Sequence, residues 1–155
     1  MLDVGCGTGF RAAQFPGSTY LGIDPSTSET NCGVAFVQGI AECMPLHSNF
    51  FDLVLCIDVL DHVISPEYAL AEILRVIKPG GYLYLMVGNT EDEMFYLHKQ
   101  SRQMFGIREF RAHLHQFNAS FFQERLSPMF SRFETIRSKG FLFVHAQEKV
   151  KGNGL

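Results

Sequence analysis

Short runs of apolar residues recur along the chain and favour strands. Seven such runs occur, at Leu2–Val4, Thr19–Ile23, Val34–Val37, Leu53–Ile57, Tyr82–Val87, Phe133–Arg137 and Leu142–Ala146. Helical patterns separate most of them, and strands that alternate with helices are typical of a parallel α/β sheet. The last two runs are joined through residues 138–140 only, which favours an antiparallel hairpin. We therefore expect an α/β fold with a mostly parallel seven-stranded sheet.

Three stretches have the pattern of helices. In the clearest one Ser65 is a candidate N-cap and Pro66 occupies the first turn. Its buried face follows at helical spacing, in Ala69, Leu70, Ile73, Leu74 and Ile77. The residues KPGG at 78–81 end this helix and lead into the next strand. A second helix is expected from about Thr90, and a third after Asn118.

The composition bounds the class of protein. The 155 residues are 46% hydrophobic and 19% charged, which is ordinary for one globular domain covering residues 1–155. No apolar stretch approaches the roughly 18 to 20 residues of a membrane span, and no secretory signal is visible. The four cysteines are scattered without metal-ligand spacing. Reduced thiols, a cytoplasmic location and no metal site are the expectation.

The net charge of −3 hides an asymmetry along the chain. Residues 1–98 carry 3 Lys and Arg against 12 Asp and Glu, whereas residues 99–155 carry 10 against 4. A solvated basic surface is the plain explanation. The sharper alternative is that the C-terminal part offers cations to an anionic substrate. The lack of an overall positive charge, of Trp and of an NPPY-type tetrapeptide argues against a nucleic-acid partner.

The stretch LDVGCGTGF at residues 2–10 places a glycine at every second position directly after the first predicted strand. Such a turn between strand and helix is the entrance of nucleotide-binding units, although a turn that only needs positive φ also explains it. Asp24 ends the second predicted strand, where a carboxylate can accept two ribose hydroxyls or cap the segment that follows. Phe10 replaces the third glycine of a dinucleotide fingerprint, which disfavours a nicotinamide-dependent dehydrogenase.

Five motifs occur in order over residues 1 to about 88: LDVGCGTG, LGIDPS, GIAECMPL, FDLVLCIDVLDHV and ILRVIKPGGYLYL. Together they resemble class I S-adenosylmethionine-dependent methyltransferases, and most of all the small-molecule type 11 group that includes the ubiquinone-biosynthesis enzymes. The resemblance implies a Rossmann-like fold with helices on both faces of the sheet. It also implies a cofactor-binding half at 1–88, a substrate side at 89–155, and methyl transfer from S-adenosylmethionine to a small-molecule acceptor.

The resemblance further implies roles for particular residues. The methionine part of the cofactor would be held by Asp3, Gly5, Cys6, Gly7 and Gly9. Asp24, followed by Pro25, would take the ribose hydroxyls, and Ala41 and Glu42 would lie beside adenine. Cys56 and Ile57 would line the path to the sulfonium methyl. An acid near the glycine turn suits the ammonium group of the cofactor.

A hydroxyl or acidic-carbon acceptor would also need a general base. The candidates are Asp58, Asp61, His62, His113 and His115, each of which could instead be a cap or a loop residue. His62 and His115 are the preferred candidates, because imidazole exchanges protons near neutral pH.

The chain departs from the family pattern in three ways. The family has helices before the first strand, and here the sequence starts at Met1, so we expect either a truncated sequence or a pocket cover built from residues 89–130. About ten residues separate Asp24 from the third strand, which leaves room for little more than a turn. Ile40 stands where the family often has an acid beside adenine. These departures support a second hypothesis, a truncated or catalytically inactive methyltransferase-like domain that binds a partner, and a homodimer remains open.

Overall fold

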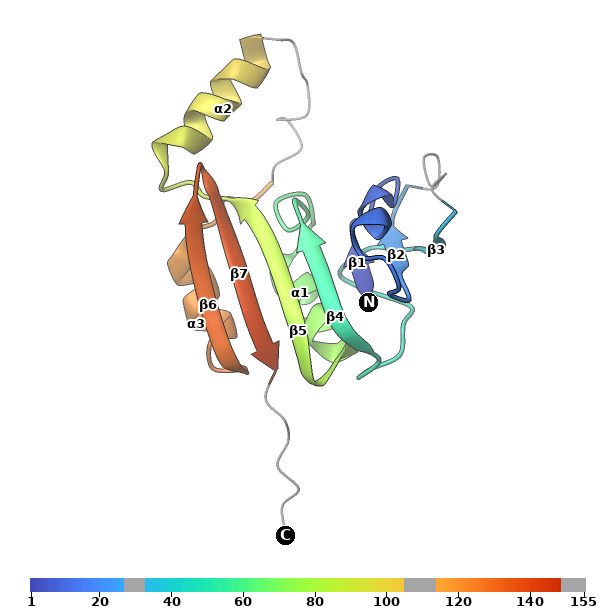
Figure 1. Ribbon diagram of the computed structural model, residues 1–155. Coiled ribbons are helices and arrows are strands. Elements are labelled where there is room, and N and C mark those ends of the chain that lie inside the picture. Colours follow the sequence, from blue (N-terminus) through green and yellow to red (C-terminus); the bar gives the residue numbers. More distant parts are fainter. Residues whose placement is uncertain (27–32, 105–113, 149–155) are drawn as a thin grey trace.

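Seven strands form one sheet in the computed structural model, which describes residues 1–26, 33–104 and 114–148. The strands are β1 (Leu2–Val4), β2 (Leu21–Asp24), β3 (Ala35–Gln38), β4 (Phe51–Ile57), β5 (Ile77–Gly88), β6 (Phe130–Ser138) and β7 (Phe141–Glu148). Their order is β3-β2-β1-β4-β5-β7-β6 (Figure 1). Strand β7 is antiparallel to β5 and β6, and the other pairs are parallel. The predicted fold class, with its C-terminal hairpin, is confirmed.

The hairpin follows from its two turn residues. Lys139 and Gly140 both have positive φ, 49° and 82°, as the tightest hairpin turns require. The side chains of β7 then alternate between the two faces of the sheet, and Leu142, Val144 and Ala146 are buried.

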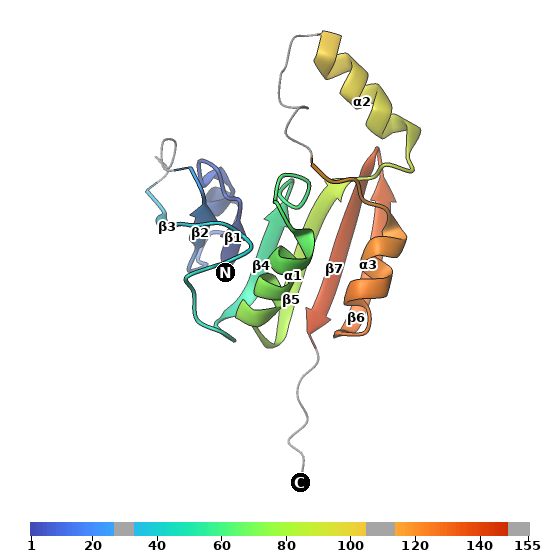
Figure 2. The ribbon, with the colours of Figure 1, turned by 180° about the vertical axis from the view of Figure 1, so that it is seen from behind.

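Helices α1 (Pro66–Val76) and α3 (Ala119–Leu126) pack on the same face of the sheet, as Figure 2 shows. Ser65 and Asn118 cap them, accepting from the N–H groups of Tyr68 and Phe121, which confirms both predicted helix starts. The core lies between these helices and the sheet. Its largest fully buried side chains include Leu60, Ile73, Leu83 and Phe122.

The other face carries a short 3₁₀ helix, η1 (Phe10–Gln14), beside β1. Cross-strand register aligns Asp3, Leu55, Tyr84 and His145 on this face, and Arg11 of η1 reaches the Asp3 carboxylate. No described helix covers the β5 and β7 part of this face (Figure 1), where Tyr82, Tyr84 and Phe143 are exposed. Helix α2 (Glu93–Met104) extends beyond the end of the sheet.

Two details differ from the expectations. Ile77 is not helical: its φ and ψ of −69° and 136° are extended, and it begins β5 ahead of the predicted start at Tyr82. Pro79 cannot continue a helix, and the fully buried Ile77 side chain is held equally well by a strand. Helix α2 begins at Glu93 rather than near Thr90. The short connection after Asp24 includes residues 27–32, which lie outside the described part of the chain.

None of the helices in the described ranges is long and apolar enough to cross a membrane.

Candidate functional site

The glycine turn lies at the carboxyl end of β1, where parallel α/β sheets bind ligands. Gly5, Gly7 and Gly9 all have positive φ, at 66°, 53° and 77°. The N–H groups of Gly5 and Cys6 donate to the carbonyl of Ile23 at 2.8 and 3.2 Å, which holds the turn against β2. The glycines therefore meet a conformational need that other residues satisfy poorly.

Gly5 also meets a need for close approach. A Cβ atom at Gly5 would lie 2.3 Å from Cγ2 of Val59, in the segment after β4. A Cβ atom at Gly7 would meet nothing within 4 Å. The first glycine brings two segments together, whereas the second leaves open space above the turn.

Asp24 connects the end of β2 to the glycine turn. Its Oδ2 accepts from the Gly7 N–H at 3.0 Å, and its Oδ1 accepts from the Ser26 N–H at 2.9 Å. The second contact is the local cap considered from the sequence. The first holds the turn in place, and a carboxylate with two oxygens retains lone pairs for a ligand as well.

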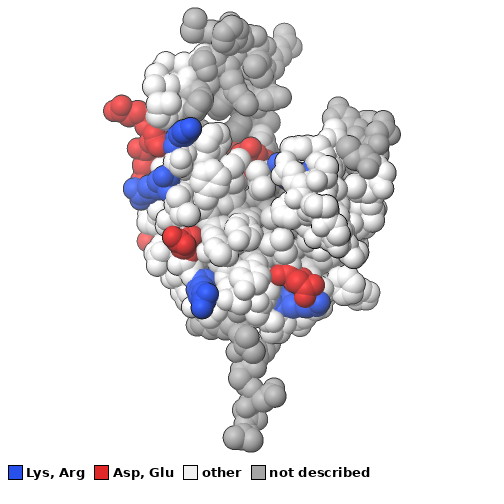
Figure 3. Space-filling view, viewed as in Figure 1, with Lys and Arg blue, Asp and Glu red and all other residues white. Residues whose placement is uncertain are grey.

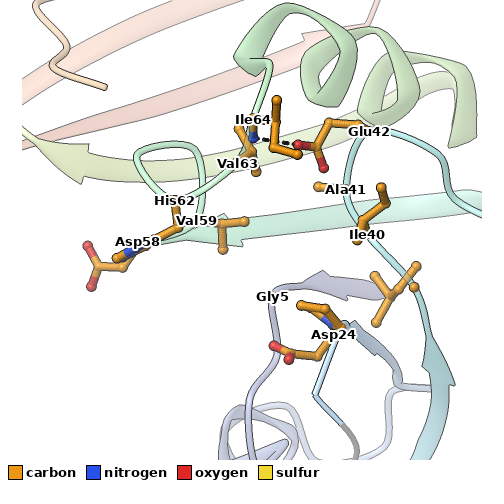
Figure 4. Close-up of a pocket in the computed structure, with 13 residues that line it drawn as sticks. Gly5, Asp24, Ile40, Ala41, Glu42, Asp58, Val59, His62, Val63 and Ile64 are labelled. Atoms are coloured by element: carbon orange, nitrogen blue, oxygen red, sulfur yellow. Dashed lines mark hydrogen bonds between the residues drawn. The ribbon is translucent and has the colours of Figure 1, made fainter. Parts of the chain in front are cut away.

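A cavity of about 410 Å³ opens beside these residues. Its lining residues come from the ends of β1, β2, β3 and β4 and the segments that follow them: Gly5, Ile23, Asp24, Pro25, Gly39, Ile40, Ala41, Glu42, Asp58, Val59, His62, Val63 and Ile64. Gly5 and Asp24 face Glu42, Val63 and Ile64 across the pocket in Figure 4, and Asp58 and His62 lie at the opposite end from Ile40 and Ala41. Three of the described lining residues are acidic, and the described lining contains no Lys or Arg.

Glu42 joins the two loop walls of the pocket. Its Oε1 accepts from the Ile64 N–H at 2.7 Å (Figure 4). The same oxygen accepts from the Ser65 N–H at 3.5 Å. The carboxylate thus satisfies backbone groups just before α1, and Ala41 next to it is buried. This contact gives Glu42 a structural role as well as a place in the lining.

Seven of the residues singled out from the sequence line the cavity. They are Gly5, Asp24, Pro25, Ala41, Glu42, Asp58 and His62. Asp3, Cys6, Gly7 and Gly9 belong to the glycine turn or its strand but are not in the lining.

Cys56 does not line the cavity, contrary to the expectation. Its side chain is fully buried in the core on the α1 side of the sheet, and this burial raises the pKa of its thiol far above the usual range. Ile57 is also outside the lining, and Asp58 and Val59 form this part of the wall instead. Side chains alternate between the faces of a strand, and at β4 the residues just beyond its end form the pocket wall.

Asp3 is completely buried beneath the glycine turn. The Tyr20 hydroxyl donates to its Oδ2, and Arg11 Nη1 lies 3.6 Å from the same atom. Burial raises the pKa of this carboxyl despite both contacts, and Oδ1 has no hydrogen-bond partner among the described residues. Burial and the nearby Asp3 also raise the pKa of Cys6 to about 11, so its thiol packs against Gly22 as a neutral group.

The histidines take different places. His62 lines the pocket with its side chain 38% exposed, and its Nε2 lies 3.8 Å from Oδ2 of the buried Asp61. His115 lies outside the lining, and its Nε2 donates to the carbonyls of Val63 and Ile64 at 2.9 and 3.2 Å. The structure therefore uses His115 to anchor a pocket wall. His113 lies outside the described residues.

Sequence reasoning overlooked several apolar lining residues, chiefly Val59, Val63 and Ile64. Their side chains carry no chemical signature. The available signal was positional, because the segment directly after a central parallel strand faces the ligand crevice.

Residues 2–85 match a protein family described as "Methyltransferase domain". An uncharacterized methyltransferase of Mycobacterium leprae is 35% identical over 95 residues, or 55% of this chain and 35% of that protein. A ubiquinone biosynthesis O-methyltransferase of Pectobacterium atrosepticum is 29% identical over 102 residues, or 57% and 42%. Both matches thus span less than half of those curated relatives.

Among solved structures, the fold is similar to that of an S-adenosylmethionine-dependent methyltransferase of Thermotoga maritima, described as a possible histamine N-methyltransferase. The TM-score is 0.78 at 22% identity, over 96% of this chain and 81% of that one.

Proposed function

Because the chain belongs to the methyltransferase domain family, we propose that its pocket binds S-adenosylmethionine and that the protein transfers the methyl group to a small-molecule acceptor. The observation that carries the proposal is the acidic lining of the cavity, which comes from Asp24 at the end of β2, Glu42 after β3 and Asp58 after β4. A cationic sulfonium ligand gains from three nearby carboxylates. A dinucleotide, with its anionic diphosphate, would be repelled by them.

The residues present fit this cofactor. The cavity volume falls within the roughly 300–1,000 Å³ that is usual for small-molecule sites. Asp24 supplies carboxylate oxygens for ribose hydroxyls, and Ile40 and Ala41 supply an apolar wall for adenine. Beneath the glycine turn, the buried Oδ1 of Asp3 is an acceptor that no described residue uses. It suits the ammonium group at the amino-acid end of the cofactor.

The bound cofactor supplies an activated methyl group, so the chain itself has to orient the acceptor and exclude water. Val59, Val63 and Ile64 form an apolar wall along the pocket. Such orientation contributes up to about 7–11 kcal/mol to lowering a barrier.

His62 is the residue that we propose as general base. It is in the pocket lining at the end away from Ile40, and the Asp61 carboxylate would stabilise the imidazolium formed when it takes a proton. We expect His62→Gln to lower kcat by about 10²- to 10⁴-fold and to leave cofactor affinity unchanged. An unchanged kcat would remove His62 from the chemistry, and Asp58→Asn is the variant to measure next.

An anionic acceptor is the finer part of the proposal, and the surplus of cations in residues 99–155 supports it. The face in Figure 3 shows its charges in scattered groups of both signs, and Arg137 pairs with Glu91 at 3.2 Å. The Lys and Arg side chains that contact an anionic acceptor would therefore belong to a few small groups on the surface. A cytoplasmic location is part of the same proposal and is supported by the free thiols of Cys6, Cys43 and Cys56.

Calorimetric titration tests the proposal. S-adenosylmethionine and S-adenosylhomocysteine should bind with dissociation constants in the micromolar range, and NAD should give no heat. Added salt should weaken the binding of S-adenosylmethionine more than that of S-adenosylhomocysteine, because only the sulfonium cation is attracted by the acidic wall. No heat with either adenosyl ligand, on protein shown to be folded, would contradict the proposal and favour a module that binds a partner.

A further inference from the structure

The segment between β3 and β4 forms a pocket wall without regular structure of its own. Residues 39–50 contain one isolated bridge, between Ile40 and Cys43, and no helix or strand. Yet Gly39, Ile40, Ala41 and Glu42 are all in the lining. A wall of this kind must be held from outside, since its backbone groups have no ladder to pair with.

Glu72 and Arg75, one turn apart on α1, provide that support. Glu72 Oε2 accepts from the Met44 N–H at 2.7 Å. Arg75 donates to three groups of the segment, the carbonyls of Met44 and Leu46 at 2.9 and 2.7 Å and the Ser48 hydroxyl at 3.2 Å.

The two side chains also fix each other. Arg75 donates to both carboxylate oxygens of Glu72, from Nε at 2.6 Å and from Nη2 at 2.8 Å. This bidentate pairing lowers the pKa of Glu72 and keeps it charged. Both side chains are largely covered, with exposures of 20% for Glu72 and 32% for Arg75. The pair therefore presents a rigid set of donors and acceptors to the segment.

The segment in turn holds the start of the same helix. Glu42 accepts from the N–H groups of Ile64 and Ser65, immediately before α1 begins at Pro66. Helix α1 is thus connected to the pocket wall at both of its ends. A shift of the wall at Met44 would be transmitted to Glu42, and through it to the opposite wall at Ile64.

We propose that Glu72 and Arg75 are positioning residues that set cofactor affinity by holding both walls of the adenosyl end of the pocket. This inference rests on the proposed function. Neither residue lines the cavity, so they act through Met44, Leu46 and Glu42. A wall that is already ordered loses less freedom when the ligand binds, and affinity rises for that reason.

The test is Arg75→Met, which keeps the length of the side chain and removes every donor. Lys78→Met is the matched control, because it makes the same kind of change in an ion pair with Asp52 at 2.7 Å, at the opposite end of the parallel strands. We expect Arg75→Met to weaken the binding of S-adenosylhomocysteine and of adenosine about tenfold or more. Lys78→Met should leave both affinities unchanged. The KM for the cofactor should rise while kcat stays within about twofold, because only uniform binding is lost.

Hydrogen exchange gives a readout without ligand. The Met44 amide should exchange faster in Arg75→Met than in Lys78→Met, and Arg75→Lys should restore part of the protection and affinity. If Arg75→Met does not fold, Arg75→Lys and Glu72→Gln serve as the test variants, each compared with Lys78→Met. Parent-like affinity in folded Arg75 variants would overturn the positioning role while the proposed function stands. Failure of the parent protein itself to bind S-adenosylhomocysteine would overturn both.

Discussion

The contact between Gly5 and Val59 makes a quantitative prediction about the glycine turn. Gly5→Ala forces a side chain into φ of +66° and places its Cβ 2.3 Å from Val59 Cγ2. Left-handed backbone costs an L-residue roughly 1–2 kcal/mol, and overpacking typically costs about 1–3 kcal/mol. We expect the free energy of unfolding to fall by about 2–5 kcal/mol, a large part of the roughly 5–15 kcal/mol of an ordinary domain.

Gly7→Ala separates the two contributions. Gly7 has φ of +53°, but a Cβ there meets nothing within 4 Å, so only the backbone cost of roughly 1–2 kcal/mol applies. The difference between the two variants is therefore the clash with Val59. Since Val59 lines the pocket, that clash should also weaken cofactor binding.

A double-mutant cycle checks the reasoning. Val59→Ala removes both clashing methyl groups, so Gly5→Ala in that background should cost about 1–3 kcal/mol less than in the parent. Urea unfolding followed by far-UV circular dichroism is the assay, because the chain has no Trp to report by fluorescence. A coupling energy near zero, or a Gly5→Ala variant no less stable than Gly7→Ala, would refute the close-approach argument.

Three further predictions concern single side chains. Asp24→Ala should weaken S-adenosylhomocysteine binding about tenfold or more, equivalent to roughly 1.4 kcal/mol, in a protein that still folds; unchanged affinity in calorimetry would refute a ribose contact. Asp3→Asn should raise Tm at pH 7 and weaken the binding of the cofactor. Because burial raises the Asp3 pKa, the parent loses stability as pH rises from the usual Asp pKa up to the raised pKa of the folded protein. The variant's advantage should therefore disappear in acid, and a pH-independent difference would count against this cause. In native protein iodoacetamide should modify Cys43, which is exposed, and spare Cys6 and Cys56, as peptide mass spectrometry can check.

The strands, though not their order across the sheet, were within reach of the sequence because each strand depends on a local pattern. The apolar runs predicted all seven strands, and Ser65 and Asn118 predicted two helix starts through their capping side chains. The boundary at Ile77 was not predictable in this way. An apolar residue at helical spacing fits a helix and a buried strand equally well. Pro79 favours the strand only because the chain after it cannot continue the helix.

The part of the site that is built on strand ends was also predictable. Gly5 and Asp24 each follow from their position directly after or at the end of a parallel strand. Cys56 was misplaced because this residue, one before the end of β4, points into the core, and the two residues that follow the strand form the wall. A shift of one residue along a strand moves a side chain to the other face of the sheet. The local sequence pattern does not show which face a residue near the end of a strand takes.

The irregular walls were the least predictable part, for a reason that their hydrogen bonds make plain. Glu42 and His115 have the chemistry of a ligand and a base, but both bind backbone groups of residues 63–65. Loops without a ladder need side chains to satisfy their N–H and carbonyl groups, so they take up polar residues near a site. His62 lies in the same loop yet faces the cavity. Residue type therefore identifies the candidate ligand-binding and catalytic residues. The hydrogen bonds that the loop backbone takes from these side chains then decide which candidate can act on a ligand.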